Sequence, residues 1–131
     1  MQSLLKGSMY FKFVGHVEVD VRIGDLDGKK FKEVKALVDT GATFTVLPEN
    51  VAKELNLPLM GEKVRVSTAK GYDELELTHA LIEIDGKRRI VPVLVSRHIE
   101  RTLLGVITLE AMQLRVNPIT EKLEEYTARL Y

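Results

Sequence analysis

Apolar and polar side chains alternate along much of this chain, as they do in a β-strand with one buried face. The first clear run covers residues 17–23, where four aliphatic side chains alternate with polar or charged ones. This period of two predicts a half-buried strand. Asp27-Gly28 predicts a turn, and a second strand is expected at residues 31–38. The start of the chain therefore indicates a β-hairpin.

The rest of the chain is typical of short strands separated by turns and two short helices. Further strands are predicted at residues 46–48, 64–66, 74–84, 89–95 and 113–116, and helices at residues 48–55 and 106–112. Asp85-Gly86 predicts a hairpin turn, and Pro92 implies a sheet edge or a bulge because proline lacks the N–H of a ladder. Residues 122–131 are compatible with strand or helix. The residues alone predict an all-β barrel or sandwich.

Length and composition narrow the class of protein. With 131 residues the chain is expected to form one domain over residues 1–131, in which residues 1–8 are expected to be a tag or disordered, because Gly7-Ser8-Met9 resembles a cloning remnant. The absence of cysteine excludes disulfides, thiolate nucleophiles and cysteine-based zinc sites. His16, His79 and His98 share no metal-ligand spacing, so we expect no metal and no cofactor.

Charge gives no argument for a nucleic-acid partner, since 19 basic residues balance 19 acidic ones. The run Lys87-Arg88-Arg89 is short and is expected at a solvated hairpin end. No stretch is apolar for long enough to be a membrane span or a signal-peptide core. We therefore expect neither a nucleic acid nor a membrane as partner, and a cytoplasmic location.

The candidate for chemistry is the triplet Asp39-Thr40-Gly41, which directly follows the apolar strand end Ala36-Leu37-Val38. A carboxylate in a tight turn beside a buried strand is poorly solvated, which perturbs its pKa. Two such carboxylates held face to face share one proton, so one can act as a base on water while the other donates to a carbonyl oxygen. Because the triplet occurs once, such chemistry requires two chains. The alternative is a turn that Asp39 merely caps.

The surroundings of the triplet carry a family resemblance. Ala42-Thr43 follows it, and much later Leu103-Leu104 runs into Gly105 and a helix. With these elements the chain resembles, over residues 17–118, the retropepsin-like aspartic proteases, which include the retroviral proteases and their single-domain cellular relatives. The resemblance implies a retropepsin-like closed barrel, the acid-protease fold, with one or two short helices.

The resemblance also implies a role for each matching segment. Asp39 would be the catalytic aspartate, in an active-site loop that continues through Thr40, Gly41, Ala42 and Thr43. Leu103-Leu104-Gly105 would form the supporting loop that passes behind it. A flap, the hairpin that closes over substrate, would lie at residues 67–72, with Thr68, Ala69, Lys70, Gly71 and Tyr72 at or near its tip. We expect Tyr72 to be a packing residue.

The chain departs from the viral pattern at three places, one of which is the expected flap, which contains fewer glycines than viral flaps do. Thr43 stands where retroviral enzymes usually carry an acid, so contacts to the substrate backbone are expected to differ there. After Gly105, the sequence Val106-Ile107 lacks the arginine that often supports the viral dimer, which leaves the dimer interface open.

The resulting hypothesis is an aspartic endopeptidase that acts as a homodimer, with one Asp39 from each subunit activating a water to hydrolyse a peptide or protein substrate. The alternative is a catalytically silent peptide-binding or dimerisation domain of the same fold. A third hypothesis is a structural β-barrel without a site.

Overall fold

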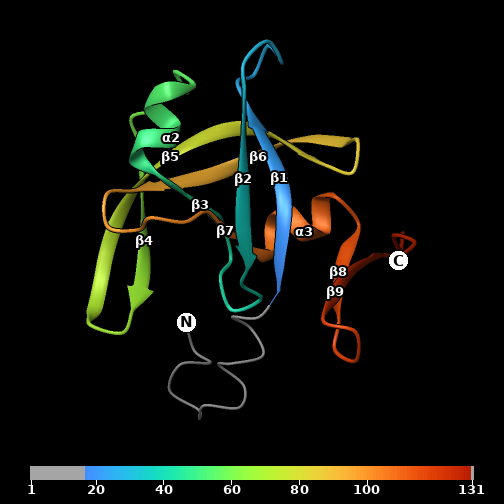
Figure 1. Ribbon diagram of the computed structural model, residues 1–131. Helices are drawn as coiled ribbons and strands as arrows, with labels where there is room; N and C mark the ends of the chain where they lie inside the picture. Colours follow the sequence, from blue (N-terminus) through green and yellow to red (C-terminus); the bar gives the residue numbers. More distant parts are fainter. Residues whose placement is uncertain (1–16, 131) are drawn as a thin grey trace.

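The computed structural model describes residues 17–130 and is built mainly from strands (Figure 1). The strands of the main sheet are β1 (Glu18–Gly24), β2 (Phe31–Val38), β3 (Thr45–Pro48), β4 (Lys63–Thr68), β5 (Gly71–Ile84), β6 (Lys87–Ser96) and β7 (Leu103–Leu104). The other elements are the helices α2 (Glu49–Glu54) and α3 (Val106–Ala111) and the strands β8 (Leu114–Asn117) and β9 (Lys122–Glu125). The predicted all-β fold class with two short helices is confirmed.

The main sheet is joined end to end. Its strand order is β1-β2-β7-β3-β6-β5-β4, and β1 additionally pairs with β5 through the register Arg22↔Glu83. This extra pairing links six strands into a ring and leaves β4 outside it, hydrogen-bonded to β5 alone. Joining the ends of a sheet removes the open edges at which sheets otherwise associate.

The core lies inside this ring and comes from the inward positions of the alternating strands. Its largest fully buried side chains from strands are Ile23, Leu47, Ile82 and Leu104, and Met112 joins them from the end of α3. Each removes its apolar surface from water, which stabilises the fold by about 1.5–3 kcal/mol per side chain. The period of two in the sequence is thus the inside-outside alternation of the sheet.

The predicted turns form as local sequence chemistry requires. Asp25 accepts backbone N–H bonds from Lys29 and Lys30 at 2.9 and 3.2 Å, and this closes the β1–β2 hairpin. Asp85 and Gly86 both have positive φ, of 49° and 82°, as the tight turn between β5 and β6 requires. Both predicted hairpins are confirmed.

Pro92 illustrates how the sheet accommodates a residue without a backbone N–H. It lies within β6 opposite His79 of β5, but β6 acquires its second neighbour, β3, only from Val93 onward. At Pro92 the strand is therefore still an edge, which agrees with the sequence expectation.

The sequence left residues 122–131 open between strand and helix, and the structure forms a strand over only part of them, while residues 126–130 form neither. Residues Lys122–Glu125 form β9, which pairs with β8 in a separate two-stranded sheet. In Figure 1 this β8–β9 hairpin lies on one side of the ring, and the β4–β5 hairpin extends on the other. The expected tag at residues 1–8 lies outside the described residues. Within the described range, no helix is long and apolar enough to cross a membrane.

Candidate active site

Asp39 occupies the first position after β2 and is held by the backbone around it. Its N–H donates to the carbonyl oxygen of Leu104 at 2.9 Å, and its carbonyl oxygen accepts from the Ala42 N–H at 3.1 Å. The Gly41 N–H donates to Asp39 Oδ1 at 3.0 Å. With only 3% of its surface exposed, the residue combines a fixed main chain with an oriented carboxylate.

The environment of Asp39 favours the neutral carboxylic acid. Burial raises the pKa of the Asp39 carboxyl, while the backbone N–H groups of Gly41 and Ala42 act in the opposite direction. Desolvation prevails because it penalises the charged form more than these donors stabilise it. A carboxyl of this kind retains its proton to higher pH than an exposed aspartate does.

The segment that includes Leu103, Leu104 and Gly105 passes directly behind the loop that carries Asp39. The N–H groups of Val106 and Ile107 donate to the carbonyl oxygens of Ala42 and Thr43 at 2.8 and 3.0 Å. These bonds tie the beginning of α3 to the loop that carries Asp39. The orientation of Asp39 therefore depends on a segment more than sixty residues away.

Gly105 makes this approach possible. A Cβ at this position would overlap the carbonyl group of Phe44 and lie 2.9 Å from the carbonyl oxygen of Ala42. The N–H of Gly105 donates to the buried Thr45 hydroxyl at 3.1 Å, and that hydroxyl lies 2.6 Å from the hydroxyl of Thr108. The glycine is thus required because two backbones touch.

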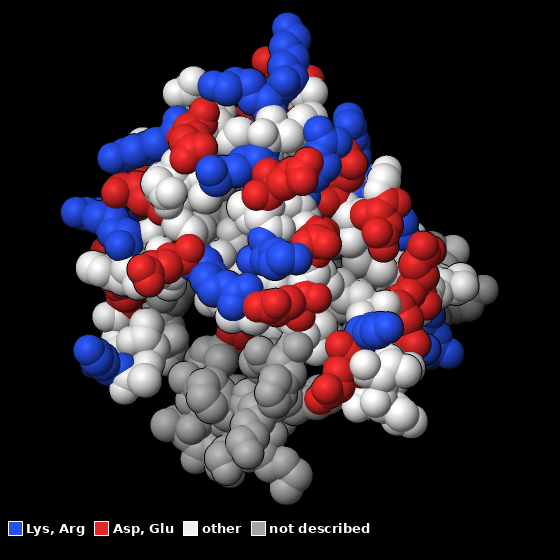
Figure 2. Space-filling view, in the orientation of Figure 1, with Lys and Arg blue, Asp and Glu red and all other residues white. Residues whose placement is uncertain are grey.

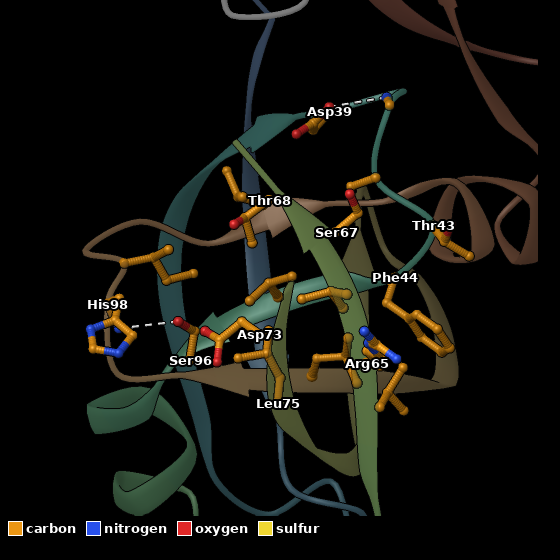
Figure 3. Close-up of a pocket in the computed structure, with 18 residues that line it drawn as sticks. Asp39, Thr43, Phe44, Arg65, Ser67, Thr68, Asp73, Leu75, Ser96 and His98 are labelled. Carbon is orange, nitrogen blue, oxygen red and sulfur yellow. Dashed lines mark hydrogen bonds between the residues drawn. The ribbon is translucent and has the colours of Figure 1, made fainter. Parts of the chain in front are cut away.

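A cavity of about 570 Å³ lies between the active-site loop and the β4–β5 hairpin. Figure 3 shows Asp39 at one end of it and Asp73, Ser96 and His98 gathered toward the other, with Ser67 and Thr68 of β4 between them. Its apolar lining comes from both sides: Ala42, Phe44, Val46, Val64, Val66, Leu75, Leu94, Ile99 and Leu103. A space of this size and character suits an extended peptide with apolar side chains.

The residues predicted for the flap lie at the end of the β4–β5 hairpin. Thr68 lines the cavity, and Ala69 and Lys70 form the turn at the tip. The Thr68 hydroxyl donates to the carbonyl oxygen of Gly71 at 3.1 Å and accepts from the Lys70 N–H at 3.2 Å. Gly71 has φ of +124°, which a residue with a side chain rarely adopts.

Tyr72 corrects one expectation. It does not pack into the protein but is 70% exposed, with the Arg65 guanidinium 4.0 Å above its ring. Tyr72 lies opposite Ser67 near the end of the hairpin, where both residues are exposed. An aromatic ring there can bury its face only against a neighbouring side chain.

The remaining loop residues divide by exposure. Thr40, Gly41 and Thr43 are exposed and Ala42 is half-buried, so the tip of the loop is accessible while Asp39 at its start is buried. Gly41, Ala42 and Thr43 also line the cavity.

Sequence reasoning missed Asp73, Ser96 and His98 in the cavity wall. For Asp73 a signal existed: Leu77 and Leu75 occupy alternate positions of β5, and the next position of that series is 73. The predicted strand began one residue too late, at position 74, to reveal it.

Charges on the surface are mixed. Figure 2 shows basic and acidic side chains interspersed over the visible face, without a large area of one sign. The run at residues 87–89 begins β6, and its side chains bond within the protein: Lys87 Nζ and Arg89 Nε donate to the carbonyl oxygens of Met112 and Ala111, and Arg88 pairs with Glu83. No group of three or more potential metal ligands occurs among residues 17–130.

Comparison with known proteins identifies the family. The model of the gag-polyprotein putative aspartyl protease family matches residues 20–111, a range that includes the Asp39 loop, the β4–β5 hairpin and Gly105. The chain belongs to this aspartyl protease family. No curated protein matches its sequence.

Solved structures of aspartyl proteases share the fold. The EIAV protease in complex with the inhibitor HBY-793 is 25% identical, with a TM-score of 0.56, over 72% of this chain and 85% of the viral one. A retropepsin-like aspartic protease from Rickettsia conorii is 22% identical, with a TM-score of 0.57, over 79% and 85%. The retroviral protease-like domain of Ddi1 from Leishmania major is 15% identical, with a TM-score of 0.53, over 83% and 87%. The chain therefore has a retropepsin-like fold.

Proposed function

We propose that this protein is an aspartic endopeptidase that acts as a homodimer. The observation that carries the proposal is the buried carboxyl of Asp39, held by its loop on the wall of a cavity of about 570 Å³ beneath a projecting hairpin. Membership of an aspartyl protease family supports the same reading.

The homodimer follows from the count of active-site triplets. The chain contains one Asp-Thr-Gly sequence, and the proposed chemistry needs two carboxylates in contact. A two-fold axis would bring the same loop from each subunit together. Thr40 and Gly41 are exposed at the loop tip, where such a contact would be made.

The mechanism is general acid–base hydrolysis by the paired Asp39 carboxyls. Two carboxyls in contact share one proton, because both cannot ionise cheaply in a poorly solvated site. The ionised one takes a proton from a water that attacks the peptide carbonyl, and the protonated one donates a hydrogen bond to the carbonyl oxygen. Burial already favours the protonated form in each subunit. The reaction needs neither a covalent intermediate nor a metal or cofactor.

The substrate is a peptide or protein segment in extended conformation. It would lie in the cavity between the active-site loop and the β4–β5 hairpin, which acts as the flap and excludes water when it closes. The apolar lining predicts aliphatic or aromatic side chains near the cleaved bond.

Cleavage of an unfolded protein from acidic to neutral pH tests this proposal. Asp39→Asn is expected to lower the rate by about a hundredfold or more, the usual contribution of general acid–base catalysis. Asp27→Asn makes the same change on an exposed turn and is the matched control. A statine inhibitor should block the wild type, and activity is expected at mildly acidic pH. Cleavage that survives Asp39→Asn, or that rises steadily into alkaline pH, contradicts the mechanism.

Subunit mixing tests the shared site directly. When wild type and Asp39→Asn chains are exchanged in equal amounts, about a quarter of the dimers carry two intact carboxyls. Activity per total protein should then fall to about a quarter of that of pure wild type. A fall to only half would mean that each chain acts alone.

The alternative is a catalytically silent peptide-binding or dimerisation domain of the same fold. Peptide or statine binding by a wild type that cleaves nothing would favour it. The cytoplasmic location stays a prediction from the sequence.

A further inference from the structure

One carboxylate occupies an inward position of the β4–β5 hairpin. Asp73 pairs with Val66 across the hairpin, and the next inward pair is Val64 with Leu75. Because side chains alternate along a strand, these four residues share one face. Asp73 is half-buried and is the charged member of this otherwise aliphatic group.

The protein itself provides Asp73 with little compensation. Among residues 17–130, the neighbouring Glu74 N–H donates to Asp73 Oδ1 at 2.8 Å, and no ion pair includes Asp73. A carboxylate accepts about four hydrogen bonds, so most of its capacity remains available.

Arg65, the basic residue of this hairpin that lines the Asp39 cavity, is engaged elsewhere. The guanidinium of Arg65 lies over the ring of Tyr72, and Arg65 pairs across the strands with Glu74. In Figure 3 Arg65 points toward Phe44, away from Asp73. Asp73 therefore faces the cavity without an ion pair to Arg65. The other basic residues of the hairpin, Lys63 and Lys70, form no ion pair with it among residues 17–130 either.

Asp73 also lies where two cavities meet. Asp73, Leu75 and His98 line both the cavity that contains Asp39 and a second one of about 500 Å³ on the side of α2. Ser96 lines the cavity that contains Asp39 at the same end, and its hydroxyl accepts a hydrogen bond from the backbone N–H of His98 at 3.0 Å (Figure 3). A long side chain entering from the Asp39 side would pass aliphatic surface before reaching the carboxylate.

We propose that Asp73 selects a basic side chain, lysine or arginine, at one position of the peptide substrate. The methylene stem would pack on Leu75 and Val66 while the cationic head binds the Asp73 carboxylate, an arrangement that suits long basic side chains. The inference rests on the proposed function, because it names the substrate class of that same site. Its readout nevertheless includes binding, which does not require catalysis.

Matched peptides measure this selectivity during cleavage. Each peptide has apolar residues around the cut and carries lysine at one flanking position, and its partner carries norleucine there. At one position the wild type is expected to prefer lysine by about tenfold in kcat/KM, the lower end for a hydrogen bond between charged groups. Asp73→Asn should abolish the preference for lysine. Asp73→Lys should instead prefer a third peptide, which carries glutamate at the same position. Glu74→Gln, which removes a charge from the opposite face of the same strand, should retain it.

Binding of the same peptides to an Asp39→Asn background separates the two proposals. Fluorescence anisotropy should show the lysine preference there, and its loss when Asp73→Asn is added. If the wild type cleaves nothing but this preference is observed, the proposed catalysis fails and the selection by Asp73 stands. Equal binding of lysine and norleucine peptides, no binding of either, or a preference that persists in Asp73→Asn overturns the selection.

Discussion

Replacing Gly105 by alanine tests the contact on which the site is built. The glycine lies where the supporting loop crosses the active-site loop, and its backbone is extended, with φ of −95° and ψ of 177°. Alanine adopts these angles without strain, so the substitution changes only the space that the residue occupies. The added methyl would overlap the carbonyl group of Phe44.

The expected loss of stability in Gly105→Ala depends on which atoms must move to make room for the methyl group. Overpacking in a tight interior typically costs about 1–3 kcal/mol, and here the obstacle is backbone rather than a flexible side chain. Separating the loops also weakens the bonds from Val106 and Ile107 to Ala42 and Thr43, each worth about 1 kcal/mol. A loss of about 4 kcal/mol in the free energy of unfolding is expected, a large share of the usual 5–15 kcal/mol.

Urea denaturation at fixed protein concentration measures this loss, since a dimer's stability depends on concentration. The control is Gly86→Ala, which places a methyl in open space at φ of +82° and should cost about 1–2 kcal/mol through backbone strain alone. Gly105→Ala should also abolish cleavage by displacing Asp39. If it unfolds at the same urea concentration as the wild type, or is less harmful than Gly86→Ala, the two backbones do not touch as described.

Two further predictions concern buried polar groups of the site. Because burial raises the pKa of Asp39 above the 3.8 of a free side chain, the folded state holds this proton more tightly than the unfolded state. Asp39→Asn should therefore match the wild type in stability below pH 3.8 and become more stable than the wild type as the pH rises through the pKa of Asp39 in the folded protein. Urea titrations at a series of pH values measure this difference in stability. A wild type that becomes the more stable of the two as the pH rises contradicts the prediction. Thr45→Val leaves both the Gly105 N–H and the Thr108 hydroxyl without their partner and should lower the stability by about 2–3 kcal/mol. Thermal unfolding should show a smaller loss for Thr108→Val, which leaves the Gly105 bond in place. Equal losses would mean that the Gly105 bond contributes nothing.

Local pattern was sufficient for the elements whose signals are local. Strand β2 ends at Val38 as predicted, because the alternation and the turn that follows lie within ten residues of one another. The Asp85-Gly86 hairpin forms for the same reason, since these two residues favour the positive φ angles that its turn requires.

Other features could not be seen from neighbours in the sequence. The two residues of β7 carry no periodicity, yet they pair with both β2 and β3. Tyr72 is an aromatic residue, which the sequence predicts to pack, but it lies near the exposed end of its hairpin. The closure of β1 onto β5 joins residues about sixty positions apart.

The sequence by itself determined the strands that show a period of two, the turns between them, and that the chain contains one Asp-Thr-Gly carboxyl. Only the tertiary structure decided that Gly105 touches the loop of Asp39, that a cavity separates this loop from the hairpin, and that Asp73 faces into it. The physical reason is the distance along the sequence over which each interaction acts. Turn chemistry and strand period are satisfied by adjacent residues, whereas strand pairing and burial are decided by the whole chain at once.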